Sequence, residues 1–168
     1  MTNMAYTPLA LANTFVAKYG DGHGIDHMKL QKLAFYAYGW WLAYNPDPIL
    51  TEGPEVWRYG PVFSSLYNVL CTHRMVPVKE PQKAVPIGPP PTIPTDNQMA
   101  HEWIDWIWQR YGNLSAMTLS DMTHKEGTPW QMEAAAKNYK VPRHHKIPDD
   151  IIKTYFLGEA ERLNAATA

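Results

Sequence analysis

The sequence predicts a mainly α-helical fold: a single helical domain, residues 1–168, with a small two- or three-stranded β element. Apolar residues recur at helical spacing through most of the chain. Residues 25–44 become apolar on all sides, which is typical of a helix buried in a larger core. A chain of 168 residues fits one domain, and a domain of this size buries roughly 68–70% of its unfolded surface.

The first helix is expected at residues 8–19. This segment predicts an amphipathic helix because it places apolar side chains four positions apart, at Leu11, Phe15 and Tyr19. The glycines within residues 20–24 predict the turn that leads into the next helix.

The second helix, residues 25–44, is expected to be the core helix. Asp26 is its expected N-cap, because a carboxylate can accept hydrogen bonds from the free N–H groups of a first turn. Lys29 stands where a capping box would have Glu or Gln, so Asp26 caps alone or uses its charge on another partner. Gly39 costs about 1 kcal/mol relative to Ala in a helix, so we expect another backbone to approach it closely.

The β element is expected to begin at residues 55–59, whose side chains alternate in character as in a short strand. Gly60 and Pro61 are expected to end this strand, and helical periodicity resumes in residues 61–73. A second short strand is expected within residues 76–79.

Three segments are expected outside regular structure. Seven prolines between Pro77 and Pro94 predict an extended loop with polyproline II character at about residues 74–95. Residues 137–146 predict an exposed basic linker; alternatively, this linker binds an acidic partner more strongly once its histidines are protonated, below about pH 6.5. Residues 164–168 predict a flexible tail.

Four helices are predicted in the C-terminal half from residues that suit the free N–H groups and positive end of a helix. These signals are the Thr95–Gln98 capping box, Leu114–Ser115, Thr128 followed by Pro129, and the Asp149–Asp150 pair. Gly112 and Gly127 are expected to end the first two of these helices.

Composition excludes several classes of protein. Fifteen Lys and Arg against sixteen Asp and Glu give a net charge of -1, so the chain lacks the basic field of nucleic-acid binders. No run of about 20 apolar residues could form a membrane span. One cysteine excludes an internal disulfide framework, and no secretory signal is visible, so a cytoplasmic location is expected.

Patterns that could carry catalysis or bind metals are weak. His101 and Asp105 share a helix face, but no third ligand follows, so no metal site is expected. The glycines before the second helix lack the spacing of a phosphate-binding loop, and no cofactor is expected. Asp121 and His124 lie three apart beside Ser120, but no nucleophile elbow is present, so no catalytic residue is assigned.

Three sequence blocks together are similar to one known family. They are residues 25–40 (IDxMKLQKL, then YAxGW), 55–67 (ExWxYGPV, then LY) and 119–130 (LSxxTHxxGxPW), where x marks a position that carries no part of the pattern. Their order and spacing resemble the Panacea domain, the family of SocA-like antitoxins that also appears in phage-associated proteins. The similarity spans roughly Leu9 to Leu157, and the proline loop and Lys125 depart from the family pattern.

The resemblance implies a helical antitoxin that silences a cognate protein toxin by direct binding, or as an adaptor that delivers it to a cytoplasmic protease. It names no particular toxin, and self-association stays open. Two alternatives are kept. One is an enzyme that uses His124, with Asp121 or Glu126, to reverse a toxin's product; the other is a phage-encoded interaction protein that acts on host machinery.

The polar and aromatic residues of the three blocks are the candidate partner-binding residues: Asp26, Lys29, Gln31, Lys32, Trp57, Arg58, Tyr59, His124 and Trp130. The fold alone does not demand the polar side chains among them, whereas residues such as Leu30 are scaffold. Trp57 and Tyr59, on a short strand near a sheet edge, are the best candidates for aromatic anchors at an interface. In the alternative, the polar residues form an internal hydrogen-bond network between the long helix, the strand and a short helix.

Overall fold

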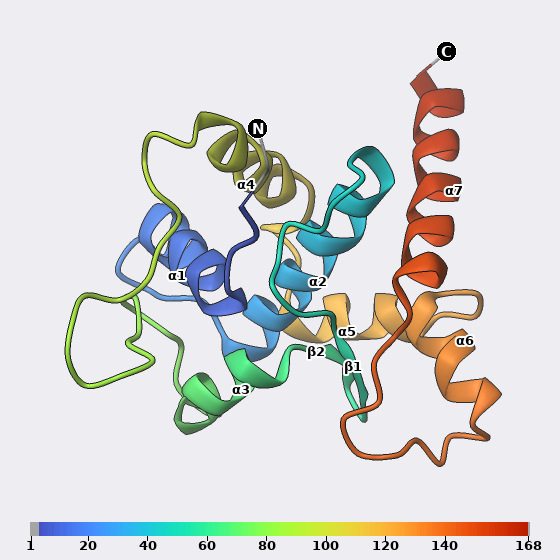
Figure 1. Cartoon of the computed structure of the whole chain (residues 1–168), viewed down its shortest axis with the longest axis horizontal. Helices are drawn as coiled ribbons and strands as arrows, with labels where there is room; N and C mark the ends of the chain where they lie inside the picture. The colour runs from blue at the N-terminus through green and yellow to red at the C-terminus, as the bar shows by residue number, and fades with distance from the viewer. Residues whose placement is uncertain (1–3, 168) are drawn as a thin grey trace.

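Helix α2 (His27–Tyr44) runs through the middle of the fold, and most other helices pack against it (Figure 1). The computed structural model describes residues 4–167. This part of the chain is mainly helical, as predicted, with one two-stranded antiparallel sheet. The other elements are α1 (Pro8–Tyr19), β1 (Glu55–Trp57), β2 (Gly60–Val62), α3 (Ser64–Leu70), a 3-10 turn (Cys71–His73), α4 (Gln98–Tyr111), α5 (Ala116–His124), α6 (Pro129–Ala136) and α7 (Asp149–Thr167).

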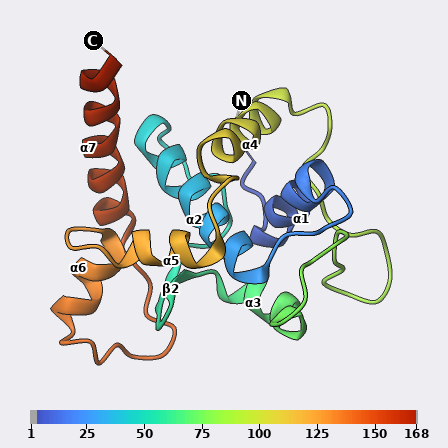
Figure 2. The same ribbon diagram turned by 180° about the vertical axis from the view of Figure 1, so that it is seen from behind.

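Helix α2 is the core of the molecule, as its sequence predicts. Every residue from Leu30 to Leu42 is buried. A Cβ on Gly39 would overlap the ring of Phe156, which belongs to α7. The expectation that another backbone approaches Gly39 is therefore wrong, because an aromatic ring occupies the space. Seen from behind in Figure 2, α7 projects beyond the rest of the fold at its C-terminal end.

The two strands form a hairpin, and the expectation that Gly60 and Pro61 end the strand is wrong, since both belong to β2. Gly60 takes a φ of 110°, a conformation that only glycine adopts readily. Pro61 lies opposite Val56, whose N–H donates to the carbonyl of His145 on the other side of β1 (2.9 Å). Proline at this position therefore removes no hydrogen bond from the hairpin.

The strand expected within residues 76–79 is also absent from the described fold. Val78 instead forms an isolated antiparallel bridge with Ile25, through two backbone hydrogen bonds of 2.9 and 3.0 Å. The second strand of the sheet is β2, so the chain segment that follows α3 contributes no strand to it.

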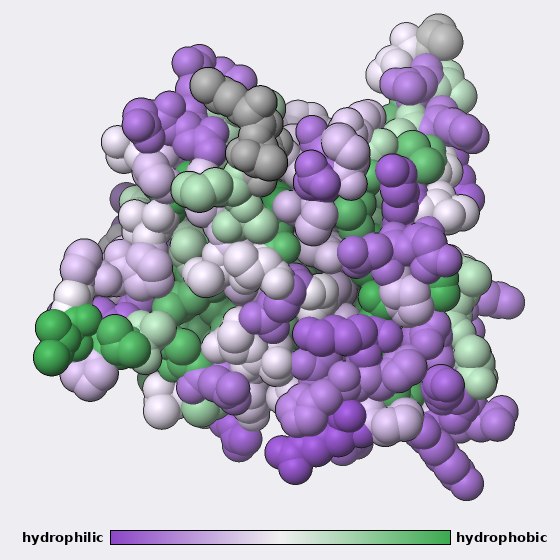
Figure 3. Space-filling view, in the orientation of Figure 1, coloured by the Kyte–Doolittle hydropathy of each residue, from purple (hydrophilic) through white to green (hydrophobic). Residues whose placement is uncertain are grey.

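The proline loop, residues 79–94, contains no helix or strand, and two buried side chains of α1 anchor it. The amide of Asn13 donates to the carbonyls of Gln82 and Pro91 (2.8 Å each) and accepts from the N–H of Gln82 (2.8 Å). The hydroxyl of Thr14 accepts from the N–H of Ile93 (2.9 Å). Between these anchors the loop exposes the apolar side chains of Val85 and Ile87. Figure 3 shows hydrophobic groups that project from the surface on the side of the molecule where this loop runs in Figure 1.

The C-terminal helices begin near their predicted signals, with two corrections. The cap of α4 is Asn97 rather than Thr95, because Asn97 directly precedes the first helical residue and its side chain accepts from a first-turn N–H. Ser115 and Thr128 cap α5 and α6 as expected. Helix α5 ends at His124, before the glycine expected to end it.

The basic linker, residues 137–146, is tied to the rest of the fold. His144 Nδ1 lies 3.1 Å from Oε1 of Glu55, and His145 Nε2 lies 2.6 Å from Oε1 of Glu133. These acidic partners belong to the same chain, so the linker is not merely solvated.

Helix α7 continues through Thr167, so residues 164–167, expected as a flexible tail, are helical, whereas residue 168 lies outside the described part. None of the helices within residues 4–167 combines the length and hydropathy that a membrane span requires.

Candidate partner-binding site

Three consecutive backbone carbonyls at the turn of the hairpin are held by side chains from α5 and α6. They belong to Trp57, Arg58 and Tyr59. The indole Nε1 of Trp130 donates to the first (2.7 Å), His124 Nε2 lies 3.1 Å from the second, and the hydroxyl of Ser120 donates to the third (2.8 Å). The backbone of the turn is therefore held in place by α5 and α6.

Both ring nitrogens of His124 face backbone carbonyls, one in α5 itself and one in the turn. Nδ1 lies 2.7 Å from the carbonyl oxygen of Ser120, Nε2 faces the carbonyl oxygen of Arg58, and the ring packs on Trp130 at 4.1 Å between centroids. A general base needs a nitrogen within reach of a substrate proton, and here both nitrogens face backbone. Within the described residues, no group of three or more His, Cys, Asp or Glu side chains is placed to hold a metal ion.

The side chains of Arg58 and Tyr59, in contrast, face outward. Tyr59 is 57% exposed. Arg58 is also exposed, and its Cζ lies 5.4 Å from the centre of the Tyr59 ring. Trp57 is half-buried and packs against Tyr67, with 4.7 Å between ring centroids. Trp, Tyr and Arg are the residues most enriched among those that dominate protein–protein binding energies.

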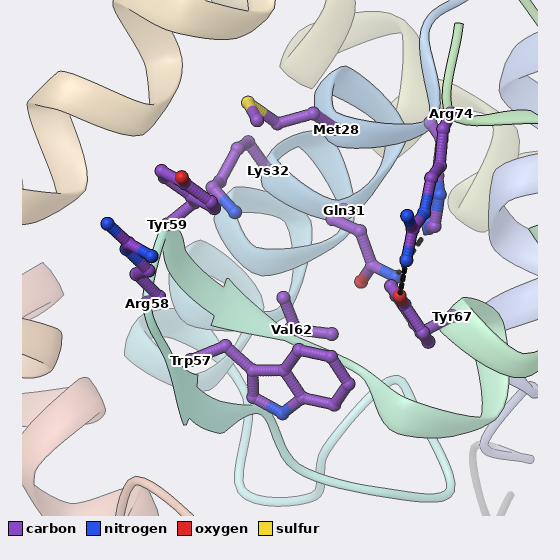
Figure 4. Close-up of a pocket in the computed structure, with 10 residues that line it drawn as sticks. Met28, Gln31, Lys32, Trp57, Arg58, Tyr59, Val62, Tyr67 and Arg74 are labelled. Atoms are coloured by element: carbon purple, nitrogen blue, oxygen red, sulfur yellow. Dashed lines mark hydrogen bonds between the residues drawn. The ribbon is translucent and has the colours of Figure 1, made fainter. Parts of the chain in front are cut away.

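A pocket of about 470 Å³ lies between the hairpin and the N-terminal half of α2 (Figure 4). Five of its lining residues are among the predicted site residues: Gln31, Lys32, Trp57, Arg58 and Tyr59. The others were missed: His27, Met28, Val62, Tyr67 and Arg74. Met28, Val62 and Tyr67 lie in the family-like blocks, which was the available signal, whereas His27 and Arg74 carry none.

Lys32 is a buried cation in the wall of this pocket. Its side chain is almost fully buried, and Nζ donates to the carbonyl of Pro61 (3.1 Å). Burial lowers the pKa of Lys32 to about 7, because the charged form loses its hydration. Figure 4 shows the amine pointing toward the hairpin beside Tyr59.

Other predicted residues hold the scaffold together. Gln31 Oε1 accepts from the N–H of Phe63 (2.9 Å), which joins α2 to the start of α3. Lys29 Nζ donates to the carbonyl of Gly112 at the end of α4 (2.5 Å). Asp26 is the N-cap residue of α2, but its side chain makes no capping hydrogen bond. The hydrogen bonds of Gln31 and Lys29 therefore tie α2 to the start of α3 and the end of α4.

A buried carboxylate supports the hairpin on the side of the basic linker. Glu55 accepts from the indole of Trp57 (3.2 Å) and lies 3.1 Å from Nδ1 of His144. Burial alone would raise the pKa of Glu55, but hydrogen bonds from Ser64, Trp57 and His144, with the charge of Lys146, lower it below its usual range. The hairpin is thus held by the linker as well as by α5 and α6.

Residues 30–131 match the family described as antitoxin SocA-like, Panacea domain, and the chain belongs to this family. The matched segment includes the hairpin, most of the pocket and the residues that hold the turn. The chain is also 27% identical to Antitoxin SocA from Caulobacter vibrioides (strain NA1000 / CB15N), over 135 residues that cover 79% of this chain and 72% of the relative. No solved structure gives a significant match. Family membership supports an antitoxin role and implies a toxin as partner.

Proposed function

We propose that this protein is a cytoplasmic antitoxin that neutralises a cognate protein toxin by binding it directly, with the hairpin turn at the centre of the contact. One observation carries the proposal. Side chains of α5 and α6 hold the backbone carbonyls of Trp57, Arg58 and Tyr59, while the side chains of these three residues remain available to a partner. A rigid backbone lowers the entropy lost when a partner binds. The antitoxin role itself rests on the family.

The test is co-expression with the protein encoded by the neighbouring gene. The wild-type chain should relieve growth arrest and co-purify with that protein. Tyr59→Ala is expected to lower the affinity at least tenfold, because an exposed aromatic anchor is removed. The matched control is Tyr44→Ala: Tyr44 is 56% exposed, nearly as much as Tyr59, but lies at the far end of α2. This control should keep the affinity within twofold.

Absence of both a complex and relief of toxicity in this experiment would refute the proposal. Equal losses for Tyr59→Ala and Tyr44→Ala would leave the antitoxin role standing and remove the hairpin from the contact. Toxin lifetime, measured in cells with and without the antitoxin, separates simple occlusion from delivery to a protease.

His124→Ala is expected to lower stability and neutralisation together. The substitution removes the ring that faces the carbonyl of Arg58 and packs on Trp130, and a hydrogen bond of this kind contributes about 0.5–1.5 kcal/mol to stability. The measurements are the melting temperature, binding to the toxin and relief of growth arrest. A variant that keeps its melting temperature and its complex but loses neutralisation would instead support the alternative in which His124 is catalytic.

A further inference from the structure

The pocket beside the hairpin has a distinct charge. Among the described residues that line it there is no carboxylate, although the whole chain has a net charge of -1. Its cationic side chains are Lys32, Arg58 and Arg74, and its aromatic side chains, besides that of His27, are Trp57, Tyr59 and Tyr67. The pocket is therefore a local basic and aromatic surface on a slightly acidic protein.

The two arginines stand on opposite sides of an apolar centre. Arg58 lies over the ring of Tyr59, and Arg74 donates to the hydroxyl of Tyr67 (3.4 Å). In Figure 4 they occupy the two sides of the view, with Trp57 and Val62 between them. Both arginines are exposed, and within the described residues neither forms an ion pair.

Lys32, in the wall of the same pocket, has N–H groups that could donate to a further acceptor. An ammonium group has three N–H donors, and the hydrogen bond of Lys32 within the described residues goes to a single backbone carbonyl, that of Pro61. Burial without a neighbouring carboxylate disfavours its charged form. An anionic group brought into the pocket would offset that cost.

We propose that this pocket binds an acidic segment of the toxin, with an apolar side chain in the centre and carboxylates paired with Arg58 and Arg74. The inference rests on the proposed function and specifies the chemistry of the partner. Arg pairs with carboxylates through two parallel hydrogen bonds, and a volume of about 470 Å³ is within the range of typical binding pockets. A nucleic acid would need a wider basic surface than the three cations of this pocket offer, whereas a short acidic segment needs only a local one.

The experiment selects peptides from a displayed library of random 12-residue sequences on the wild-type chain. The library is first depleted on Arg58→Ser/Arg74→Ser, which removes both rim cations. The expected winners carry at least two Asp or Glu residues flanking a Leu, Phe, Tyr or Trp. Their affinity for Arg58→Ser/Arg74→Ser should fall at least tenfold, and it should weaken with added salt.

The matched control is Lys140→Ser/Arg143→Ser, which removes the same charge from exposed positions of the basic linker. It should keep peptide affinity within twofold. Unchanged melting temperatures establish that all variants are folded. Four outcomes would overturn the proposal. The library could yield no binding peptides, or binding peptides without acidic residues. The two double variants could lose equal affinity for the peptides, or the wild-type chain could bind oligo(dT) more strongly than the selected peptides.

The two proposals fail in different ways. If selected acidic peptides bind the pocket but the chain neutralises no toxin, the proposed function is wrong and the pocket chemistry stands. If Arg58→Ser/Arg74→Ser neutralises the toxin as well as wild type does, the antitoxin function stands and the acidic-segment inference is wrong.

Discussion

Gly39→Ala is expected to destabilise the protein by about 1–3 kcal/mol, although Ala is the best helix former and Gly39 lies in the middle of a helix. The added methyl group would overlap the ring of Phe156. That ring cannot move aside cheaply, because it is 1% exposed and packs against the rings of Phe35, Tyr36 and Trp40. Steric overlap should therefore exceed the gain in helix propensity.

The matched control is Gly158→Ala on α7, where an added methyl group meets no atom within 4 Å. Here helix propensity acts alone, so a stabilisation of up to about 1 kcal/mol is expected. Urea unfolding of both variants measures the difference. If Gly39→Ala proved as stable as Gly158→Ala, the contact between α2 and α7 would have to be looser than the structure has it.

Lys32→Met is expected to stabilise the protein near neutral pH and to lose that advantage as the pH rises. A pKa of about 7 in the folded state, against 10.5 for a free lysine, corresponds to roughly 5 kcal/mol of destabilisation while both states are protonated. Losing the hydrogen bond to the carbonyl of Pro61 costs about 1–3 kcal/mol in return. The net gain at pH 6–7 is therefore about 2–4 kcal/mol.

The sign of the pH dependence follows from proton binding. Between pH 7 and 10.5 the unfolded chain holds the Lys32 proton while the folded chain releases it, so this group makes the wild type more stable as the pH rises. Near pH 10.5 the burial cost has vanished, and Lys32→Met should be the less stable protein. Urea unfolding at pH 6, 8 and 10 measures the difference in unfolding free energy between the two proteins. Both proteins contain the same buried tyrosines, so the titration of these tyrosines cancels in the difference. A difference that stays constant with pH would contradict the burial of a charged amine.

Helices were predictable where apolar periodicity and a capping residue coincide, because both signals are local. Thr128 followed by Pro129 located the start of α6, and the periodicity of residues 8–19 located α1. Strand β2 was not predictable in this way. Pro61 argues locally against a strand, and what makes it acceptable is the hydrogen bond of Val56 to His145, far away in the sequence.

The candidate site was predictable only in part, for a similar reason. The alternation in residues 55–59 indicated outward-facing aromatic side chains, and Tyr59 is indeed exposed. The sequence could not decide whether Trp130 stabilises the fold or binds the toxin. Its indole donates to a backbone carbonyl 73 residues away, and every residue has such a carbonyl, so the sequence does not mark this one. Arg74 enters the pocket only through the 3-10 turn after α3, which the helical pattern did not separate from the helix.

The anchored proline loop has a consequence for how this chain can diverge. Asn13 and Thr14 bind both ends of the loop to α1 through hydrogen bonds. A change in the conformation of residues 83–90 therefore has little effect on the core. Changing the length of such a closed segment alters its entropy only logarithmically. Insertions, deletions and substitutions can accumulate there while the hairpin and its pocket stay in place. The loop can therefore vary in sequence and length although the rest of the fold cannot.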